Sequence, residues 1–454
     1  MKEGDSLRFS KQDMRRILIP IVIEQLLAVT IGMADSMMVS SAGEAAISGV
    51  SLVDTVNLLL LFMFSALSAG GSVVISQTLG KGDVPLAGNA AKQLVWVVLA
   101  VSGTLTTAVL VFRKPLLALI FGKVEADVMS NALTYFFFTS LSYPFIGLYN
   151  SHAAIFRAMG NSKTPLVASV VMNVSNLIGN AVLIFVFHMG AAGAAISTLS
   201  SRVIGSVMMM ILSRNRNNTL YIDSLFKCKF EKAVVKRICA IGIPNGIENS
   251  MFQLGKILTQ SLISTFGTAQ IAANAVGNNL VAFQYSAGGA AGIAMITIVG
   301  QCIGAGEKNE AKKYAAKLLR LAYTMLISVS LITCIFIYPL TGLYDLSPEA
   351  QGTAIKLVIA HSVAASIMHP MAFCVANSFR AASDVKYPMI MSIISMWVFR
   401  VGFSYVLGLY FHMGVMGVWL AMFCDWIFRA TLYTIRFKRG TWLKKYKPLE
   451  VTRQ

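Results

Sequence analysis

Residues 19–25 read IPIVIEQ and residues 243–249 read IPNGIEN, so an isoleucine–proline start and a glutamate recur at a spacing of 224 residues. The block QTLGKGD at 77–83 returns at the same spacing as QCIGAGE at 301–307. Blocks that repeat at one shift indicate a duplicated unit about half the chain long. The sequence therefore predicts two similar halves.

The composition is that of a membrane protein. Of the 454 residues, 56% are hydrophobic and only 13% are charged, and the mean hydropathy is +0.68. Soluble domains carry about 25% charged residues, so this chain has too few charges to cover a water-facing surface. Apolar stretches of about 20 residues, the length that crosses a hydrocarbon core, recur along the whole chain. We expect an all-α integral membrane protein with twelve transmembrane helices in two pseudo-symmetric six-helix lobes.

One long polar interruption divides the apolar stretches. It predicts an N-lobe with helices 1–6 over residues 1–213, a cytoplasmic linker over 214–237, and a C-lobe with helices 7–12 over 238–454. With both chain ends in the cytoplasm, 31 of the 38 Lys and Arg residues fall on the cytoplasmic side, counting the tails and span ends. This asymmetry satisfies the positive-inside rule. The basic residues behind the net charge of +18 are therefore expected to face anionic lipid headgroups rather than nucleic acid.

The glycine-rich blocks at 77–83 and 301–307 are expected to end membrane helices. Each follows an apolar span rather than a strand, which argues against a dinucleotide-binding loop. Glycine after a helix commonly adopts the left-handed conformation. The residues that follow the second block, Lys308–Arg320, are expected to form a basic helix on the cytoplasmic face before the next span.

Polar side chains within the N-lobe spans suggest a cation site. A charge at mid-bilayer costs at least about 2.5–3.5 kcal/mol. Asp35 has no basic neighbour in sequence, so it either exchanges a proton or a cation, caps a helix, or pairs with Arg202. Asn176 and Asn180 share a helix face, where their amides either bind a cation or join helices. Thr198 on the sixth span adds a hydroxyl.

The C-lobe spans carry a different polar set. Glu248 is the repeat counterpart of Glu24. Arg400 on the eleventh span and Asp425 on the twelfth are expected to form a structural ion pair. His369 on the tenth span either titrates near physiological pH or packs as a hydrogen-bond donor.

These residues together resemble the MATE (multidrug and toxic compound extrusion) family of cation-coupled exporters. The resemblance covers essentially the whole chain. Each motif alone is poor evidence, but their combination is quite specific. The matching segments are Pro20 with Asp35-Ser36-Met37-Met38-Val39, Gln77–Asp83, Phe156–Asn161, Asn176 with Asn180, Gly193-Ala194-Ala195 and Gly417-Val418-Trp419.

The resemblance implies a secondary active transporter rather than an enzyme. It implies two six-helix lobes, a cleft that opens alternately to either side, and export of amphipathic, often cationic small molecules in exchange for H⁺ or Na⁺. The family's N-lobe cation site uses an acid on helix 1, two side chains four apart on helix 5 and a hydroxyl on helix 6. These positions are matched by Asp35, Asn176, Asn180 and Thr198. The candidates for the substrate cavity are Glu24, Gln25, Glu248, Asn249 and His369.

The second lobe departs from the Na⁺-coupled NorM-type branch, which places acids on helices 7 and 10. Those positions hold Phe252 and His369 here, so the chain looks closer to the bacterial DinF-like branch and the N-lobe site is favoured. We expect a monomer in the bacterial inner (cytoplasmic) membrane, surrounded by lipid. The loop charges place both termini in the cytoplasm.

Two other classes of membrane protein fit the sequence less well. A flippase or exporter of a lipid-linked saccharide or another lipid-like metabolite would hold several basic residues, and a membrane-embedded enzyme would need a cluster such as HExxH, which the sequence lacks. The chain has no P-loop, so no ATP is expected, and no cofactor is expected beyond the coupling ion, H⁺ or Na⁺. The in-span cations Arg202, Lys256 and Arg400 stand against the acids Glu24, Asp35, Asp54, Glu248 and Asp425, which disfavours an anionic substrate.

Overall fold

A computed structural model of the chain describes residues 9–122, 124–225, 228–344 and 346–449. Every regular element within these ranges is a helix. Ten helices there are long and apolar enough to cross a membrane, and α8 together with the α4–α5 pair supplies two more spans. The predicted all-α membrane architecture with twelve spans is confirmed.

The helices of the first half run from α1 to α7. Helices α4 and α5 form one interrupted span: Ser142 separates them, and Pro144 in the first turn of α5 lacks the N–H that would continue α4. Their bounds are α1 Lys11–Ser40, α2 Glu44–Gly80, α3 Val84–Phe121, α4 Ala126–Leu141, α5 Tyr143–Ala158, α6 Lys163–Asn180 with a π-helical end η1 Ala181–Val186, and α7 Gly190–Ser213.

The second half begins at α8 and has more π-helical turns. Helix α8 is not among the ten apolar helices and carries the polar residues Asn245, Glu248 and Asn249 close together, and α12 passes into a π-helical turn that Pro370 opens. The bounds are α8 Lys232–Ile263, η2 Ser264–Phe266, α9 Thr268–Gly304, α10 Lys308–Ile335, α11 Ile337–Gly342, α12 Pro348–His369, η3 Pro370–Cys374, α13 Val375–Ala381, α14 Lys386–Ile394, η4 Ser395–Gly402, α15 Phe403–Tyr405, η5 Val406–Tyr410, α16 Gly414–Arg439 and η6 Thr441–Lys444.

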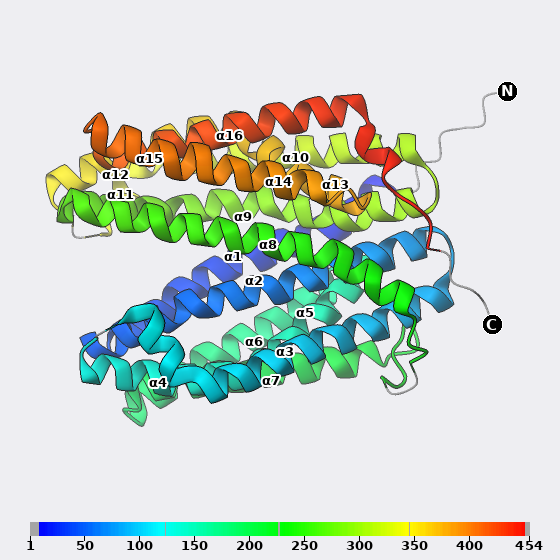
Figure 1. The fold of residues 1–454 in the computed structure, drawn as a ribbon, viewed down its shortest axis with the longest axis horizontal. Helices are drawn as coiled ribbons and strands as arrows, with labels where there is room; N and C mark the ends of the chain where they lie inside the picture. The colour runs from blue at the N-terminus through cyan, green and yellow to red at the C-terminus, as the bar shows by residue number, and fades with distance from the viewer. Residues whose placement is uncertain (1–8, 123, 226–227, 345, 450–454) are drawn as a thin grey trace. The chain divides into compact units, whose positions relative to one another are not determined.

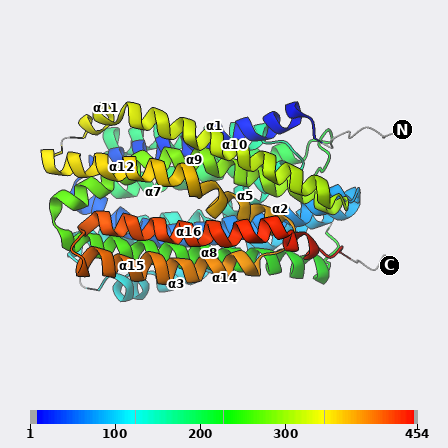
Figure 2. The ribbon, with the colours of Figure 1, turned by 90° about the horizontal axis from the view of Figure 1, so that it is seen from above.

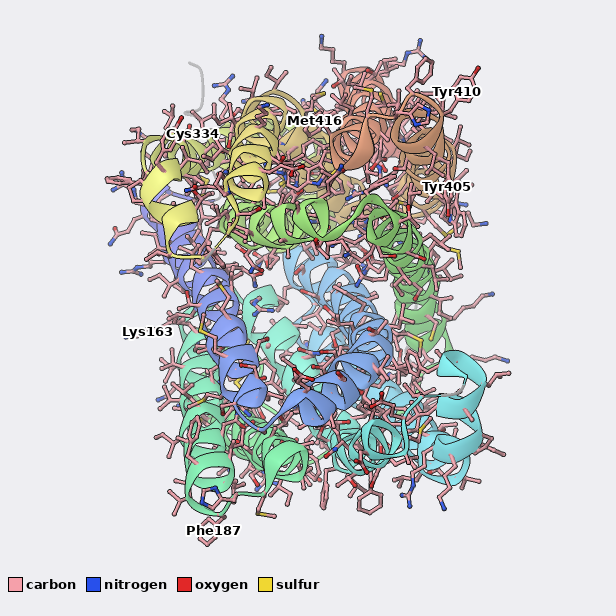
Figure 3. The ribbon with its side chains drawn as sticks, turned by 90° about the vertical axis from the view of Figure 1, so that its left-hand side faces the viewer. Lys163, Phe187, Cys334, Tyr405, Tyr410 and Met416 are labelled. Carbon is pink, nitrogen blue, oxygen red and sulfur yellow. The ribbon has the colours of Figure 1, made fainter. Side chains whose placement is uncertain are left out.

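Contacts group the described residues into two compact units. The N-terminal unit is Gln12–Gly246 with Leu449, and the C-terminal unit is Ile247–Pro448 with residues 9–11. Within each unit the long helices run side by side (Figures 1 and 2). Seen from the end of the helices in Figure 3, Phe187 and Tyr410 point outward from their own units, and they are 65% and 78% exposed. Such aromatic side chains suit a membrane–water interface.

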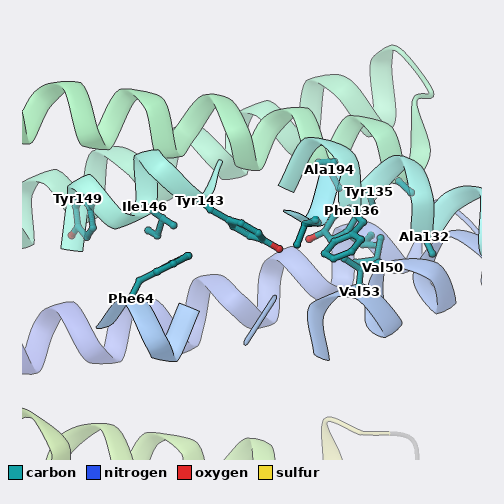
Figure 4. Close-up of a cluster of buried hydrophobic side chains, with 14 of the residues drawn as sticks. Val50, Val53, Phe64, Ala132, Tyr135, Phe136, Tyr143, Ile146, Tyr149 and Ala194 are labelled. Carbon is teal, nitrogen blue, oxygen red and sulfur yellow. The ribbon is translucent and has the colours of Figure 1, made fainter. Parts of the chain in front are cut away.

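The N-terminal unit has an apolar core between α2 and the α4–α5 pair (Figure 4). Phe64 on α2 lies against Tyr143 on α5, with ring centroids 5.8 Å apart. Helix α2 also touches the first half of α8, because a Cβ on Gly70 would lie 2.7 Å from the backbone nitrogen of Gly242. Two glycines let these backbones approach as closely as membrane helices can.

The C-terminal unit has its own core, which α9, α12 and α16 build. Trp419 and Trp426 on α16 are both buried there. The indole nitrogen of Trp419 donates to the amide oxygen of Asn274 on α9 at 2.9 Å. Both rings therefore fill the core, and the Trp419 indole also bonds across helices, whereas the Trp426 indole nitrogen has no hydrogen-bond partner among the described residues.

The duplication predicted from the sequence is visible in the backbone. Helix α2 begins and ends 224 residues before α9. Gly82 and Gly306 both have φ of 84°, in the left-handed region that favours glycine. His188 and His412 also adopt positive φ, at 52° and 53°. The repeat therefore preserves turn conformations as well as helix lengths.

One expectation about the fold was wrong. Residues 308–320 do not form a separate surface helix, because they are the first part of α10, which continues to Ile335. No glycine or proline follows Arg320 within α10 to end the helix, so the basic segment and the apolar span form one element.

Candidate functional site

The candidate coupling residues meet within the N-terminal unit. Asn180, buried at the end of α6, donates a hydrogen bond from its amide nitrogen to the Asp35 carboxylate on α1. Its amide oxygen, Oδ1, is buried without a hydrogen-bond partner in the described part of the chain. A carboxylate and an unpartnered amide oxygen thus lie together, which is a hard-oxygen pair suited to Na⁺ or to a proton held on the acid.

Asn176 lies one turn before Asn180 and joins α6 to α7. Its amide nitrogen donates to Thr198 Oγ1 at 3.4 Å and to Ser197 Oγ at 3.3 Å. Ser197 returns a bond to the Asn176 carbonyl at 2.7 Å. The four predicted residues thus form two hydrogen-bonded pairs, linked through adjacent turns of α6.

A second acid, Asp54 on α2, has its own network. Its carboxylate accepts from Tyr135 Oη at 3.1 Å and from the Asn57 amide at 3.3 Å. Tyr143 Oη donates to Asn57 Oδ1 at 2.6 Å. Figure 4 shows both tyrosines in the core between α2 and the α4–α5 pair. Sequence reasoning counted Asp54 among the in-span acids but missed these tyrosines, because only the fold brings α4 beside α2.

Arg202 is the in-span cation of this unit. Its guanidinium donates to Ser142 Oγ at 2.7 Å, at the break between α4 and α5. Pairing with Arg202 was one alternative for Asp35. Among the described residues Arg202 forms no salt bridge with Asp35, which is bonded instead to Asn180. The acid is therefore held by a neutral amide.

Glu24 and Glu248 each bond to an arginine. Arg157 Nη2 lies 2.6 Å from Glu24 Oε1, and Arg380 Nη2 lies 2.6 Å from Glu248 Oε2. Both acids are buried. These arginines were missed as partners, although FRA at 156–158 and 379–381 is itself a repeated block. The repeat thus carries a duplicated ion pair.

Asp425 on α16 lies among several donors in the C-terminal unit. Arg429 Nε is 2.6 Å from Asp425 Oδ1, and Ser395 Oγ also donates to the carboxylate. Arg400, the partner expected from the sequence, lies farther away, with Nη1 at 3.8 Å from Asp425 Oδ2. Arg429 was overlooked because it lies one turn along α16 and was assigned to a span end.

His369 lies in an aromatic cluster rather than beside an acid. Its ring stacks on Phe373 with centroids 4.7 Å apart and lies 5.0 Å from Tyr285. His361, two turns earlier, contacts Gln284 Oε1 at 2.9 Å and Tyr285 Oη at 2.8 Å. Phe252 also lies 6.1 Å from Phe373, so both positions that differ from the NorM-type pattern belong to one aromatic group.

The remaining candidates are half-buried. Gln25 and Asn249 follow Glu24 and Glu248 on α1 and α8, each in its own unit. Three arginines counted at the cytoplasmic side, Arg157, Arg380 and Arg429, belong to the ion pairs described above. Without them, 28 rather than 31 basic residues fall on that side, which leaves the asymmetry intact.

Comparisons with known proteins agree with this architecture. The MatE family matches residues 20–182 and again residues 244–406, at the same 224-residue spacing. The uncharacterized transporter YisQ of Bacillus subtilis strain 168 is 27% identical over 432 residues, which cover 94% of each protein. The probable multidrug resistance protein NorM of Thermotoga maritima is 25% identical over 448 residues, covering 96% of this chain and 94% of that protein.

The fold also matches solved structures. One is the outward-facing conformation of a multidrug resistance MATE family transporter of the MOP superfamily. Its TM-score is 0.90 at 20% sequence identity, over 98% of this chain and 99% of that chain. Because the MatE family matches most of both halves, the chain belongs to this family of membrane transporters.

Proposed function

We propose that the protein is a cation-coupled antiporter that exports amphipathic, often cationic small molecules by alternating access. The observation that carries this proposal is the Asp35–Asn180 contact. It joins the one N-lobe acid of the predicted cation site to a buried amide whose oxygen is unpartnered in the described ranges. Relatives named as probable multidrug resistance proteins support the substrate class.

The coupling step follows from the chemistry of these two residues. A proton on Asp35, or Na⁺ between Asp35 and Asn180, neutralises a charge that is costly inside the bilayer. Asn176 and Thr198 extend the polar surface across α6 and α7. The cation drives transport only if it binds one state of the protein better than the other, because equal binding shifts no equilibrium.

The branch and the orientation belong to the same proposal. Phe252 and His369 replace the acids of the NorM-type C-lobe, which supports a protein closer to the DinF-like branch. The lysine and arginine asymmetry supports a bacterial inner-membrane protein with both termini and residues 214–237 in the cytoplasm. Residues 1–8, 226–227 and 450–454 of these segments lie outside the described residues. A cysteine at the exposed Asn217 should react only with a membrane-permeant thiol reagent, and labelling from outside intact cells would refute this orientation.

Transport in proteoliposomes tests the function. The wild-type protein should move a cationic dye against its gradient when a pH gradient or a Na⁺ gradient is imposed separately, and the effective gradient identifies the coupling ion. Asp35→Asn keeps the side-chain shape and its hydrogen bonding but removes the exchangeable charge. We expect this variant to insert normally and to lose more than about 90% of gradient-driven efflux, because a cation that no longer binds one state better than the other cannot shift the equilibrium.

Glu44→Gln is the matched control, because Glu44 is an exposed acid at the start of α2 in the same unit. It should transport at the wild-type rate. Efflux by Asp35→Asn at the wild-type rate, or dye movement that ignores both gradients, would refute the proposed coupling.

A further inference from the structure

The repeat gives the candidate cation site a counterpart in the C-terminal unit. At the spacing of 224 residues, Arg400 occupies the position of Asn176, and Met422 occupies the position of Thr198. The helix-to-helix contact is kept: Asn176 Nδ2 donates to Thr198 Oγ1 at 3.4 Å, and Arg400 Nη2 approaches Met422 Sδ at 3.1 Å. The remaining counterparts, Thr259 for Asp35 and Ser404 for Asn180, replace a charged acid and an amide by hydroxyls.

This substitution pattern reverses the charge of the site. In the N-terminal unit the cluster holds one carboxylate and neutral groups. In the C-terminal unit the same helix positions hold a guanidinium, two buried hydroxyls and a thioether. A thioether sulfur is only a weak hydrogen-bond acceptor. One N–H donor of Arg400 therefore points to the Met422 sulfur, and a stronger acceptor would readily replace that sulfur.

More cations than acids surround Arg400. The Cζ atoms of Arg400 and Arg429 lie 5.2 and 5.3 Å from the ring centroid of Phe252, and Lys256 Nζ lies 5.8 Å from the same centroid. The acid beside them, Asp425, is bonded to Arg429 at 2.6 Å. In the described residues, Asp425 Oδ2 has no hydrogen-bond partner, and its approach to Arg400 is the longer 3.8 Å.

The other nearby acid does not restore the balance. Glu248 pairs with Arg380 at 2.6 Å. Three cations around one ring thus face one carboxylate, which leaves two positive charges in excess. Ionisable groups within membrane spans are costly and mark functional sites by default. A single aromatic face is a weak substitute for a counter-ion.

We propose that Arg400 and Lys256 bind the carboxylate group of an amphipathic molecule, with Phe252 contacting its apolar part. The planar guanidinium of Arg400 offers two parallel N–H donors that match the two oxygens of a carboxylate. A halide ion has a single centre and cannot form this two-bond pair. Lys256 is exposed, and the Arg400 side chain keeps 12% of its surface exposed. The site does not rest on the coupling role proposed for Asp35, because binding here requires no ion gradient.

Spatial pairing changes the charge balance that disfavoured an anionic ligand. That balance set all in-span cations against all in-span acids. The structure pairs Glu24 and Glu248 with arginines that the comparison left out, so neither acid offsets Lys256 or Arg400. The C-terminal unit by itself therefore favours an anionic group.

Binding of benzoate tests the proposal on the full-length protein in an uncharged detergent. Sodium benzoate should raise the thermal unfolding midpoint in a saturable manner. Benzamide, its neutral isostere, and sodium chloride at equal concentration should not. We expect Arg400→Gln to weaken benzoate binding by about tenfold and Lys256→Met by about threefold, because the guanidinium supplies the charge-assisted pair.

Arg113→Gln is the matched control. Arg113 also lies over a ring, with Cζ 4.9 Å from the centroid of Phe137, but it lies in the N-terminal unit. It should bind benzoate as the wild type does. Equal stabilisation by benzamide or sodium chloride would overturn the proposal, as would wild-type benzoate affinity in a folded Arg400→Gln or Lys256→Met variant.

The lipid is the second source of an anion. Compared with nanodiscs of phosphatidylcholine, nanodiscs of phosphatidylglycerol should lower the apparent benzoate affinity only by the few-fold depletion of anions that a negative surface potential causes. A loss of benzoate binding well beyond that depletion would assign the site to a lipid headgroup and would overturn the proposed carboxylate ligand.

Discussion

The N-terminal and C-terminal units share their backbone plan but differ in charge. Helices α2 and α9 have equal bounds in the repeat, and the left-handed turns at Gly82 and Gly306 have equal φ. Within the N-terminal unit, Asp35 is bonded by a neutral amide. Within the C-terminal unit, Arg400 stands at the position of an asparagine. Duplication has therefore preserved the helices while the polar side chains diverged.

The conserved part of this comparison is the pair of buried salt bridges. Glu24–Arg157 and Glu248–Arg380 have the same 2.6 Å separation and join the same positions of the repeat. A buried charge without its partner is strongly destabilising, so a duplicated pair is hard to lose one residue at a time. At a buried position that holds a neutral residue, a charged residue can replace it only if a group of opposite charge lies close by.

The largest effect should come from Asp425→Asn. This change leaves Arg429 and Arg400 without their shared carboxylate, and breaking a buried pair costs about 3–5 kcal/mol. Denaturant unfolding in detergent should show this loss, whereas Asp35→Asn should change the unfolding free energy by less than about 1 kcal/mol because its partner is neutral. If both variants lost a similar unfolding free energy, Asp425 could not be called a structural acid and Asp35 a functional one.

The next effect concerns the duplicated ion pairs. Glu24→Gln and Glu248→Gln should each lower the unfolding free energy by about 2–3 kcal/mol, since hydrogen bonds to charged groups contribute about 1.5–3 kcal/mol. The partly exposed arginine side chains, at 18% and 12%, can rehydrate in part. The two losses should be similar, because both pairs have the same 2.6 Å separation and comparable exposure. A loss confined to one unit would show that the pairs are not equivalent.

A smaller effect should separate Asn180 from its counterpart Ser404. Asn180→Ala removes the bond to Asp35, and a bond of about 1.5 kcal/mol corresponds to a loss of about tenfold in efflux driven by an imposed gradient. Ser404→Ala should leave that rate within twofold of wild type, a change of about 0.4 kcal/mol or less. Equal losses in the two variants would mean that both units share the coupling step.

The smallest effect should come from Arg400→Asn, which places the N-terminal residue in the C-terminal unit. It removes the more distant of the two arginines that share Asp425, and Asp425 keeps Arg429 at 2.6 Å, so no buried charge loses its only partner. Because the removed guanidinium is itself costly to desolvate, we expect the unfolding free energy to rise by up to about 1 kcal/mol in the absence of any added anion. A clear loss of stability would indicate that the 3.8 Å approach to Asp425 already compensates Arg400.

The fold was largely predictable because membrane helices follow from local composition. An apolar run of about 20 residues has to form a helix in lipid, since every backbone group must be paired internally. The boundary that failed was Lys308–Arg320, where a basic segment continues into α10 without a break. Composition locates the apolar part of a helix but not the polar end that extends beyond the bilayer.

The candidate site was predictable only in part. The spacing of Asn176 and Asn180 indicated a shared face, and the family resemblance added Asp35 and Thr198. Which pairs bond was decided by the fold: Asn180 meets Asp35, while Asn176 meets Thr198. Arg429 was missed although its spacing of four residues from Asp425 on one helix already places the two side chains side by side.

The sequence by itself determined the membrane class, the number of spans and the duplication, because hydropathy and repeated motifs are properties of residue order. The tertiary structure decided which charges are balanced. Arg157 and Arg380 are more than 130 residues away from Glu24 and Glu248, so no local pattern pairs them. Because Glu24 and Glu248 are paired with these arginines, they cannot balance other charges. Asp35 then has only a neutral partner, and Lys256 and Arg400 lack enough nearby carboxylates to balance them. Charge compensation depends on distance in space, and only the packing of helices sets that distance.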